Sequence, residues 1–172
     1  MEWTESGVLL TCRPHGETTA IAHILARENG RYAGIVHGAT RRHLAPTLQP
    51  GNHFKVKWRA RTVDNLGWFV LEQEKSRSVA IWNNQLALAG MTAACALLDL
   101  LVPERMAYPA LYDATIRLLD GMMEGNAWQI RYGLWEKHLI ETIGFGLELD
   151  RCAVTGSAES LIYVSPRTGR AV

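Results

Sequence analysis

Residues 54–61 read Phe-Lys-Val-Lys-Trp-Arg-Ala-Arg, an unbroken alternation of apolar and cationic side chains. Successive side chains of a β-strand point to opposite faces of the sheet. A strand therefore places the four apolar residues on one face and the four cations on the other, whereas a helical period of 3.6 would scatter the cations around the cylinder. We predict a strand whose cationic face is formed by Lys55, Lys57, Arg59 and Arg61.

This cationic face has two interpretations. A row of Lys and Arg can neutralise the phosphates of a nucleic acid. It can also be a solvated outer surface, because charged side chains protect exposed strands from aggregation. The strand by itself does not separate the two.

Four further strands are predicted in the first 80 residues. Asn29-Gly30 is a strong hairpin signal, and it makes a strand of Thr18–Arg27, which otherwise also suits a short helix. Five short strands separated by turn signals predict a small antiparallel barrel, filled by alternate side chains of each strand. The predicted strands are Gly7–Arg13, Thr18–Arg27, Arg31–His37, Phe54–Arg61 and Gly67–Glu74.

The pattern then changes to helices. Three are predicted, with Pro109 near the start of the second, Asn126 as the N-cap of the third and Gly144 as its C-terminal stop: Leu86–Leu101, Tyr108–Met123 and Ala127–Ile143. The sequence therefore predicts an α+β chain with a barrel over residues 1–80, a helical domain over 81–144 and a small β module over 145–172.

The small module is predicted to hold a strand at Leu161–Ser165, a turn at Pro166–Gly169 and a returning strand from Arg170. That second strand has barely begun at Val172. We therefore expect a C-terminal piece of the module to be missing from the chain.

Composition and cysteine usage point to a cytoplasmic globular protein. Of the 172 residues 48% are hydrophobic and 20% charged, which is typical of globular domains. No apolar run reaches the ~18 residues of a membrane span, and the N-terminus lacks the pattern of a secretory signal. Three widely spaced cysteines, Cys12, Cys95 and Cys152, argue against a disulfide framework and for a reducing compartment.

Charge is distributed unevenly along the chain. Residues 1–80 hold 11 Lys and Arg against 7 Asp and Glu, while residues 81–172 hold 7 against 10. Five of the six histidines also lie in the first segment. This asymmetry suggests an anion-binding module joined to something else.

Catalytic and metal-binding patterns are scarce in the sequence. It contains no phosphate loop, no GxSxG elbow and no HExxH motif, and no local pattern supports Cys152 as a nucleophile. Cys152–Gly156 has the form of half a zinc knuckle, with Thr155 where the second thiolate would stand. A structural zinc needs four ligands, and neither Cys nor His follows Cys152, so we expect no zinc.

Nucleic-acid binding is supported by further residues of the same segment. Arg41, Arg42 and His43 lie in the loop between the third and fourth strands, and Tyr32 can stack on an unpaired base or belong to the core. In the helical half, the aromatic residues Trp128, Tyr132 and Trp135 either line a groove for a partner peptide or form the core.

Several short motifs, in this order and spacing, resemble the RecO family of bacterial recombination mediators and DNA repair proteins. They are Glu2-Trp3, Gly7-Val8-Leu9-Leu10, His15-Gly16-Glu17-Thr18, Arg27-Glu28-Asn29-Gly30, Gly38-Ala39-Thr40-Arg41-Arg42, Leu48-Gln49-Pro50-Gly51, Gly144-Phe145-Gly146-Leu147, Cys152-Ala153-Val154-Thr155-Gly156 and Tyr163-Val164-Ser165-Pro166.

The resemblance implies an N-terminal OB-fold barrel, a helical domain and a zinc-finger-like module. It implies a protein without enzymatic activity that binds single- and double-stranded DNA and anneals complementary strands. Its implied partners are RecR and the acidic C-terminal tail of single-stranded-DNA-binding protein, through which it helps load RecA, in the nucleoid of the cytoplasm. A protein-interaction scaffold whose barrel binds a protein and not DNA is the alternative.

The family's DNA-binding positions fall on residues already singled out. Arg41 and Arg42 match by motif, and the cationic strand matches by position through Lys55, Lys57, Arg59 and Arg61. Family members that bind zinc carry paired cysteines, whereas this chain keeps only Cys152, so the resemblance also implies a zinc-free module.

Overall fold

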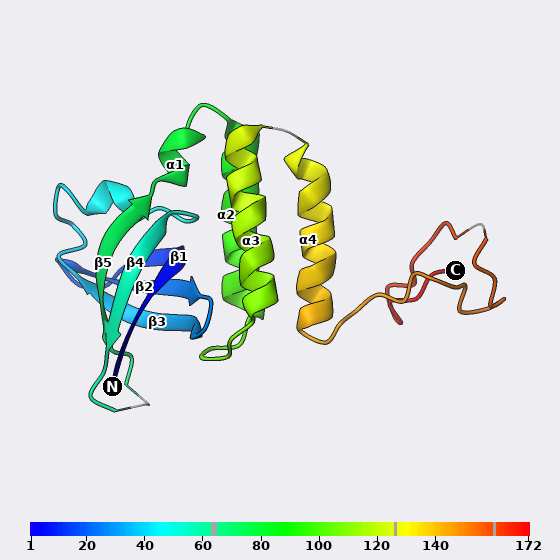
Figure 1. Ribbon diagram of the computed structural model, residues 1–172, viewed down its shortest axis with the longest axis horizontal. Helices are drawn as coiled ribbons and strands as arrows, with labels where there is room; N and C mark the ends of the chain where they lie inside the picture. Colours follow the sequence, from blue (N-terminus) through cyan, green and yellow to red (C-terminus); the bar gives the residue numbers. More distant parts are fainter. Residues whose placement is uncertain (63–64, 126, 160) are drawn as a thin grey trace. The chain divides into compact units, whose positions relative to one another are not determined.

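The computed structural model describes residues 1–62, 65–125, 127–159 and 161–172. Five strands come first and helices follow (Figure 1). The chain forms two compact units, Met1–Trp128 and Gln129–Val172.

A closed barrel occupies the start of the first unit. Its strands follow one another around the ring in the order β1, β2, β3, β5, β4. Their bounds are Glu2–Pro14 for β1, Thr19–Ala26 for β2, Gly30–His37 for β3, His53–Arg59 for β4 and Trp68–Lys75 for β5. All five predicted strands are present, although β1 begins five residues earlier than predicted and β4 ends two residues earlier, at Arg59.

The prediction of a purely antiparallel barrel was wrong at one seam. β3 and β5 run parallel, with Ile35 paired to Trp68 and Val36 to Phe69, while the other four seams are antiparallel. The reason is topological. Strand direction cannot alternate all the way around a closed ring with an odd number of strands, so one pair must be parallel.

β1 closes the ring because it pairs with two neighbours in succession. Its first half pairs with β4, from Glu2 opposite Arg59 to Val8 opposite His53, and Gly7 onward pairs with β2. The β1–β2 register shifts between Leu9 and Thr11, which is a bulge. Such an extra residue bends a strand and increases its twist, which lets one long strand serve two neighbours.

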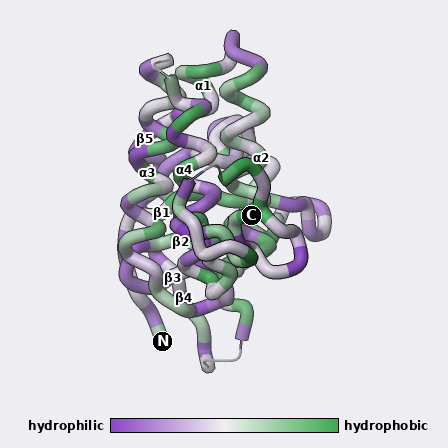
Figure 2. The backbone as a smooth tube through the Cα atoms, turned by 90° about the vertical axis from the view of Figure 1, so that its right-hand side faces the viewer, coloured by the Kyte–Doolittle hydropathy of each residue, from purple (hydrophilic) through white to green (hydrophobic). Residues whose placement is uncertain are grey.

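Alternation along the strands determines the barrel interior. Phe54, Val56 and Trp58 of β4 point inward and are at most 2% exposed. They join the interior side chains Leu9, Ala22, Ile24, Val36 and Phe69. Figure 2 shows hydrophobic and hydrophilic residues interleaved along the barrel strands.

The predicted hairpin at Asn29-Gly30 is confirmed. β2 ends at Ala26, which pairs with Gly30 at the start of β3. Gly30 has a φ of 79°, a conformation that favours glycine. The carboxylate of Glu5 accepts hydrogen bonds from the backbone N–H of Glu28 (2.8 Å) and the side-chain amide of Asn29 (2.7 Å).

Short helix α1 (Arg77–Ala80) and helices α2 (Gln85–Leu101) and α3 (Pro109–Glu124) complete the first unit. The side chain of Asn84 accepts a hydrogen bond from Ala87 and caps α2, while Gly125 ends α3 in the left-handed conformation. Helix α4 (Trp128–Thr142) follows, and its predicted cap Asn126 lies outside the described residues. No helix among the described residues is both long and apolar enough to span a bilayer.

Two polar networks fix the helices of the first unit to the barrel. Asp99 of α2 pairs with His23 of β2 and with Arg31 of β3, whose Nη1 lies 3.2 Å from Oδ1. Asp120 of α3 accepts hydrogen bonds from Lys75 Nζ (2.8 Å) and from Nε of the buried Arg77 (2.7 Å). Burial alone would raise the pKa of Asp120, but these two hydrogen bonds outweigh it and hold the pKa below its usual value.

The C-terminal segment has less regular structure than predicted. In its described residues the expected strand pair is reduced to a single antiparallel bridge between Val164 and Ala171, and a parallel bridge joins Glu148 to Arg170. The predicted turn is present, because Gly169 N donates to Ser165 O at 2.8 Å. The few cross-segment hydrogen bonds of this short stretch do not extend into ladders.

Candidate nucleic-acid interface

The cationic side chains of β4 point outward, as the alternation predicts. Lys55 and Arg59 are exposed and Lys57 is partly exposed, while the residues between them are buried. Arg61 is exposed but lies past the end of β4. Three of the four predicted cations therefore share one strand, and the fourth continues from it as a loop residue.

The neighbouring strands place acidic side chains beside this row. Arg59 stands opposite Glu2 of β1, and its Nε lies 2.8 Å from Glu2 Oε2, which is also 3.8 Å from Lys57 Nζ. Lys55 stands opposite Glu72 of β5. Directly paired residues share a face of the sheet, so the row belongs to a surface of mixed charge.

Arg41 and Arg42 lie in the loop between β3 and β4 and are exposed. The backbone of this loop is ordered by hydrogen bonds, with Arg41 N donating to Gly38 O (2.9 Å) and Ala45 N donating to Arg41 O (2.9 Å). A hydrogen bond from Ala39 N to Thr18 O (2.9 Å) attaches the loop to the turn between β1 and β2. The arginine pair thus belongs to the end of β3, which β5 separates from β4 in the ring.

The structure brings other cationic and titratable residues to the arginine pair. Arg13 and His15 lie at the end of β1 and in the turn after it, His37 ends β3, and all three are exposed. The spacing of these residues along the sequence does not show that the three segments meet.

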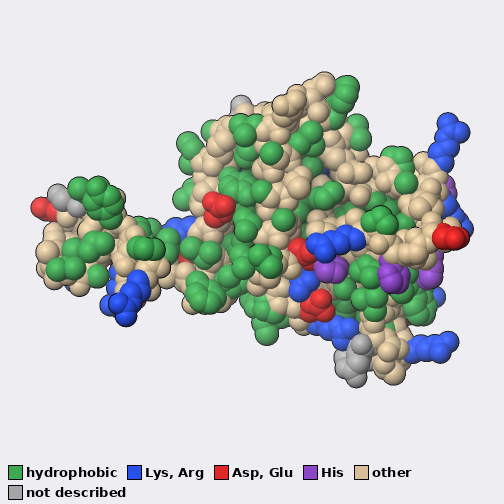
Figure 3. All heavy atoms as spheres, turned by 180° about the vertical axis from the view of Figure 1, so that it is seen from behind, with side chains coloured by type: hydrophobic (Ala, Val, Ile, Leu, Met, Phe, Trp, Pro, Cys, Tyr) green, Lys and Arg blue, Asp and Glu red, His purple; other side chains and the backbone are tan. Residues whose placement is uncertain are grey.

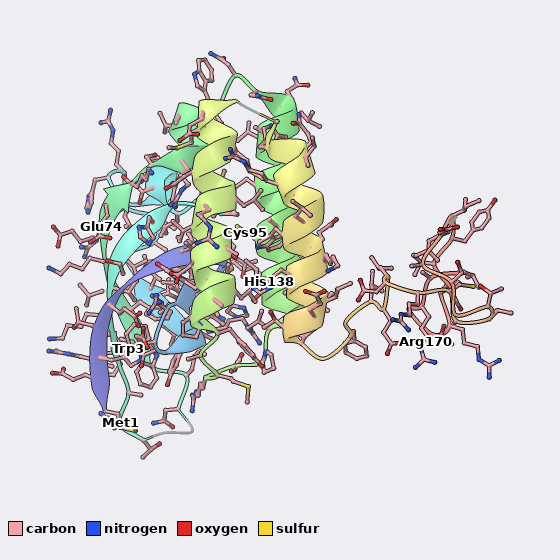
Figure 4. All side chains as sticks on the ribbon, turned by 45° about the vertical axis from the view of Figure 1, so that its right-hand side comes forward. Met1, Trp3, Glu74, Cys95, His138 and Arg170 are labelled. Atoms are coloured by element: carbon pink, nitrogen blue, oxygen red, sulfur yellow. The ribbon has the colours of Figure 1, made fainter. Side chains whose placement is uncertain are left out.

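Tyr32 belongs to an aromatic cluster at the barrel. Its ring centroid lies 4.9 Å from that of Trp58 and 5.2 Å from that of Trp3, in edge-on contacts. The guanidinium of Arg105 lies 5.4 Å from the centre of the Tyr32 ring. Trp3, labelled in Figure 4, is part of this packing. Tyr32 is therefore half-buried among aromatic rings, which favours the core interpretation over base stacking.

The predicted groove residues of the helical half are also mostly interior. Trp128 and Trp135 are 5% and 4% exposed, and Tyr132 packs against Trp135 with ring centroids 5.6 Å apart. These aromatic side chains therefore contribute to packing rather than to an open surface.

Cys152 does not have the surroundings of a zinc ligand. Its Sγ accepts a hydrogen bond from Thr155 N at 3.4 Å, and Gly156 N donates to Cys152 O at 2.9 Å. The turn Cys152–Gly156 is therefore closed by hydrogen bonds, with Thr155 at the position where a zinc knuckle has its second cysteine. In the described ranges no three His, Cys, Asp or Glu side chains are grouped as metal ligands. The residues present do not fit a structural zinc, which needs four ligands.

The surroundings of the three cysteines shift the pKa values of their thiols in different directions. Burial raises the pKa of the Cys95 thiol to about 12, and it also raises the pKa of Cys12. At Cys152 hydrogen bonds from Thr155, first from its side chain, lower the pKa. The first two thiols stay protonated at neutral pH and are poor nucleophiles.

Two family models match nearly the whole chain. The N-terminal model of recombination protein O covers residues 1–74, and the C-terminal model covers residues 83–172. The chain is 48% identical over 172 residues to the DNA repair protein RecO of Dinoroseobacter shibae, spanning all of this chain and 71% of that protein. It is 46% identical over 174 residues to the RecO of Rhodospirillum centenum, spanning 69% of that protein. The chain belongs to the RecO family of DNA repair and recombination proteins.

Proposed function

We propose that this protein is a DNA-binding recombination mediator that holds DNA phosphates on the outer surface of its barrel. The RecO family consists of mediators and not enzymes. The observation that carries the proposal is the outward row of β4, in which Lys55, Lys57 and Arg59 are solvent-accessible while the alternate residues fill the core. Arg41, Arg42 and Arg61 supply further exposed cations.

The chemistry of this surface suits a sequence-independent role. Lys and Arg that contact phosphates release counterions, so their affinity for DNA is strongly salt-dependent and independent of sequence. A mediator that anneals complementary strands needs this property, because it must hold any sequence while leaving the bases free to pair. We infer that the barrel is an OB-fold, an architecture that commonly binds oligonucleotides.

The partners follow from the family resemblance and are part of the proposal. They are RecR and the C-terminal tail of single-stranded-DNA-binding protein, and through them the protein would help load RecA on coated single strands in the nucleoid. No zinc is included, since Cys152 stands without further ligands among the described residues.

DNA binding by β4 is tested by replacing Lys55, Lys57 and Arg59 with Ala and measuring anisotropy of a labelled single strand at several salt concentrations. We expect weaker binding and a salt slope reduced by about 0.7 for each lost phosphate contact. Arg167→Ala, an exposed cation of the C-terminal segment, is the matched control. Unchanged affinity and slope in the triple variant would contradict the proposal for β4.

A second candidate function is a protein-binding scaffold, and the mixed charge around β4 favours it. Glu2 and Glu72 beside the cations would weaken attraction to DNA but suit a protein partner of mixed charge. A gel-shift assay with a labelled single strand at low and high salt distinguishes the two. Absence of any shift at low salt would favour the scaffold.

A further inference from the structure

One end of the barrel concentrates cations and histidines from three separate segments. We call it the histidine end, and its exposed residues are Arg13, His15, His37, Arg41, Arg42 and His43. His15 N donates to Thr19 O at 2.9 Å, and Thr19 stands opposite His37 in the β2–β3 pair. The loop after β3 joins the same turn through Ala39 N and Thr18 O at 2.9 Å.

Strand register shows that these side chains share the outer face. Arg13 of β1 stands opposite Ile21 of β2, which stands opposite Ile35 of β3, whereas Ala20 and Ala22 point into the core. His37 lies two residues beyond Ile35 and therefore on the same face. Arg13 on β1 and His37 on β3 have only β2 between them, so the axes of their strands are about 10 Å apart.

The loop adds its own cations beside His37. Arg41 packs over Gly38, since a Cβ built on that glycine would lie 2.6 Å from Arg41 Nε. Arg42 and His43 follow directly and are exposed. Figure 3 shows purple histidine side chains over the barrel, with blue cationic side chains near them.

The histidine end is less neutralised than the β4 row. Within residues 13–18 and 37–43, Glu17 is the only carboxylate. Across the described part of the chain, no acidic side chain lies within 4.0 Å of Arg13, Arg41 or Arg42 in an ion pair, whereas Arg59 is paired with Glu2. Three arginines and one carboxylate leave a positive surface before any histidine is protonated.

Three histidines, His15, His37 and His43, lie among these arginines. Imidazole is the side chain whose charge changes between pH 5 and 8. The segments that form this end carry Arg13 on β1, Glu17 in the turn and Arg41 and Arg42 in the loop, while β2 presents Thr19 and Ile21. Two further carboxylates come from the neighbouring elements: Asp99 of α2 lies over the same face of β1 at Thr11, and Glu72 lies on the outer face of β5, the strand beside β3. His23, farther along β2, is already paired with Asp99 and is not part of the surface.

We propose that the histidine end is a DNA-phosphate surface whose affinity increases as His15, His37 and His43 gain protons. The proposal rests on the proposed function and specifies where and under which conditions the barrel holds phosphate. A phosphate backbone passing this end would meet three fixed charges from arginine and up to three adjustable ones from histidine. The chain thereby binds DNA more tightly in mildly acidic solution than in mildly basic solution.

The test compares the full chain with a triple variant that carries His15→Gln, His37→Gln and His43→Gln. The affinity of each protein for a labelled oligo-dT is measured at pH 6 and at pH 8, at several salt concentrations. Because each single-strand phosphate contact contributes about 0.7 to the salt slope, the parent slope should steepen by up to about 2 between pH 8 and pH 6. Its affinity at moderate salt should rise about tenfold. His138→Gln, in α4, is the matched control and should behave as the parent. Circular dichroism at both pH values verifies that the variants are folded.

The results separate this proposal from the more general one. In the triple variant we expect the same slope at both pH values and unchanged affinity at pH 8. A parent that binds equally at both pH values, or a triple variant that keeps the pH response, would overturn the role of the histidine end and leave DNA binding standing. A parent that binds no DNA at either pH would overturn the proposed function, and this surface with it.

Discussion

Arg59 of β4 and Glu2 of β1 form an ion pair across the closing seam of the barrel, with Arg59 Nε 2.8 Å from Glu2 Oε2. The pair stands on the outer face, where the Glu2 side chain is 57% exposed. Its contribution to stability is small, because exposed ion pairs are typically worth less than ~1 kcal/mol. Its larger effect is on the surface, since it neutralises one of the three outward cations of β4.

Removing the Glu2 charge should therefore strengthen DNA binding. We expect Glu2→Gln to steepen the salt slope by about 0.7 on a single strand, because one more cation becomes available to phosphate. Salt-dependent anisotropy measures the change. Glu148→Gln is the control, because Glu148 forms a similar pair with Arg170, labelled in Figure 4, in the C-terminal segment. An unaltered slope in Glu2→Gln would show that DNA does not contact Arg59.

Stability should depend strongly on Asp99. Its carboxylate accepts hydrogen bonds from Thr11 Oγ1 (3.3 Å) and Arg31 Nη1 (3.2 Å) and pairs with His23. Asp99→Asn would remove the buried one of the two carboxylates that pair with Arg31, which is only 12% exposed; the more exposed Glu104, 3.5 Å from Arg31 Nη1, would remain. Breaking a buried pair costs about 3 kcal/mol, so we expect a loss of that size in the free energy of unfolding measured by urea titration.

Asp113→Asn is the matched control for Asp99. Asp113 pairs with Arg27 at 2.9 Å, but both side chains are well exposed. Its replacement should cost much less stability than that of Asp99, because exposed ion pairs contribute little. Equal losses in the two variants would mean that the Asp99 network does not anchor α2 to the barrel.

Acid should destabilise the protein through His53. Burial, followed by the charge of Arg77, lowers the pKa of His53, although Glu74 and Asp120 partly oppose this; Figure 4 labels Glu74. The unfolded chain therefore takes up a proton at higher pH than the folded chain does. Stability contributed by this group is present above its ordinary pKa of about 6.5 and is lost as the pH falls toward the lower folded pKa.

We expect the urea concentration at the unfolding midpoint of the parent to decrease when the pH is lowered from 7.5 to 5.5. His53→Gln should show a smaller decrease over the same pH range. Asp120 does not contribute in this pH range. Its pKa lies below the ordinary value near 3.8, so the stability that its charge provides is lost only at lower pH. His138→Gln should keep the parent's pH dependence. An identical pH dependence in His53→Gln and the parent would contradict the role assigned to His53.

Gly30 should be more sensitive to substitution than Gly125, although both have a positive φ. A Cβ at Gly30 would lie 2.1 Å from the Met106 carbonyl oxygen, whereas a Cβ at Gly125 meets nothing within 4 Å. Gly125→Ala should cost only the left-handed strain, about 1 kcal/mol, and Gly30→Ala clearly more. Thermal unfolding of the two variants measures the difference. Equal costs would show that the α2–α3 loop yields to the new methyl group.

Local patterns predicted much of this structure. The period of two in residues 54–61 correctly assigned Phe54, Val56 and Trp58 to the core and Lys55, Lys57 and Arg59 to the surface, because side-chain direction in a strand depends only on parity. Asn29-Gly30 identified its hairpin because few residues accept a positive φ. The predicted helices Leu86–Leu101 and Tyr108–Met123 have bounds within one residue of those of α2 and α3, and Pro109 marked the start of the second because proline is favoured in the first turn of a helix.

The sequence by itself thus determined the strands, the helices and the outward direction of the cations. Only the tertiary structure decided which charges surround those cations. Glu2 meets Arg59 because β1 closes the ring on β4. His15 and His37 lie at the same end of the barrel because His15 N donates to Thr19 O and Thr19 pairs with His37. Coulomb interactions depend on distance through space, and the register between remote strands, which no local pattern encodes, sets that distance.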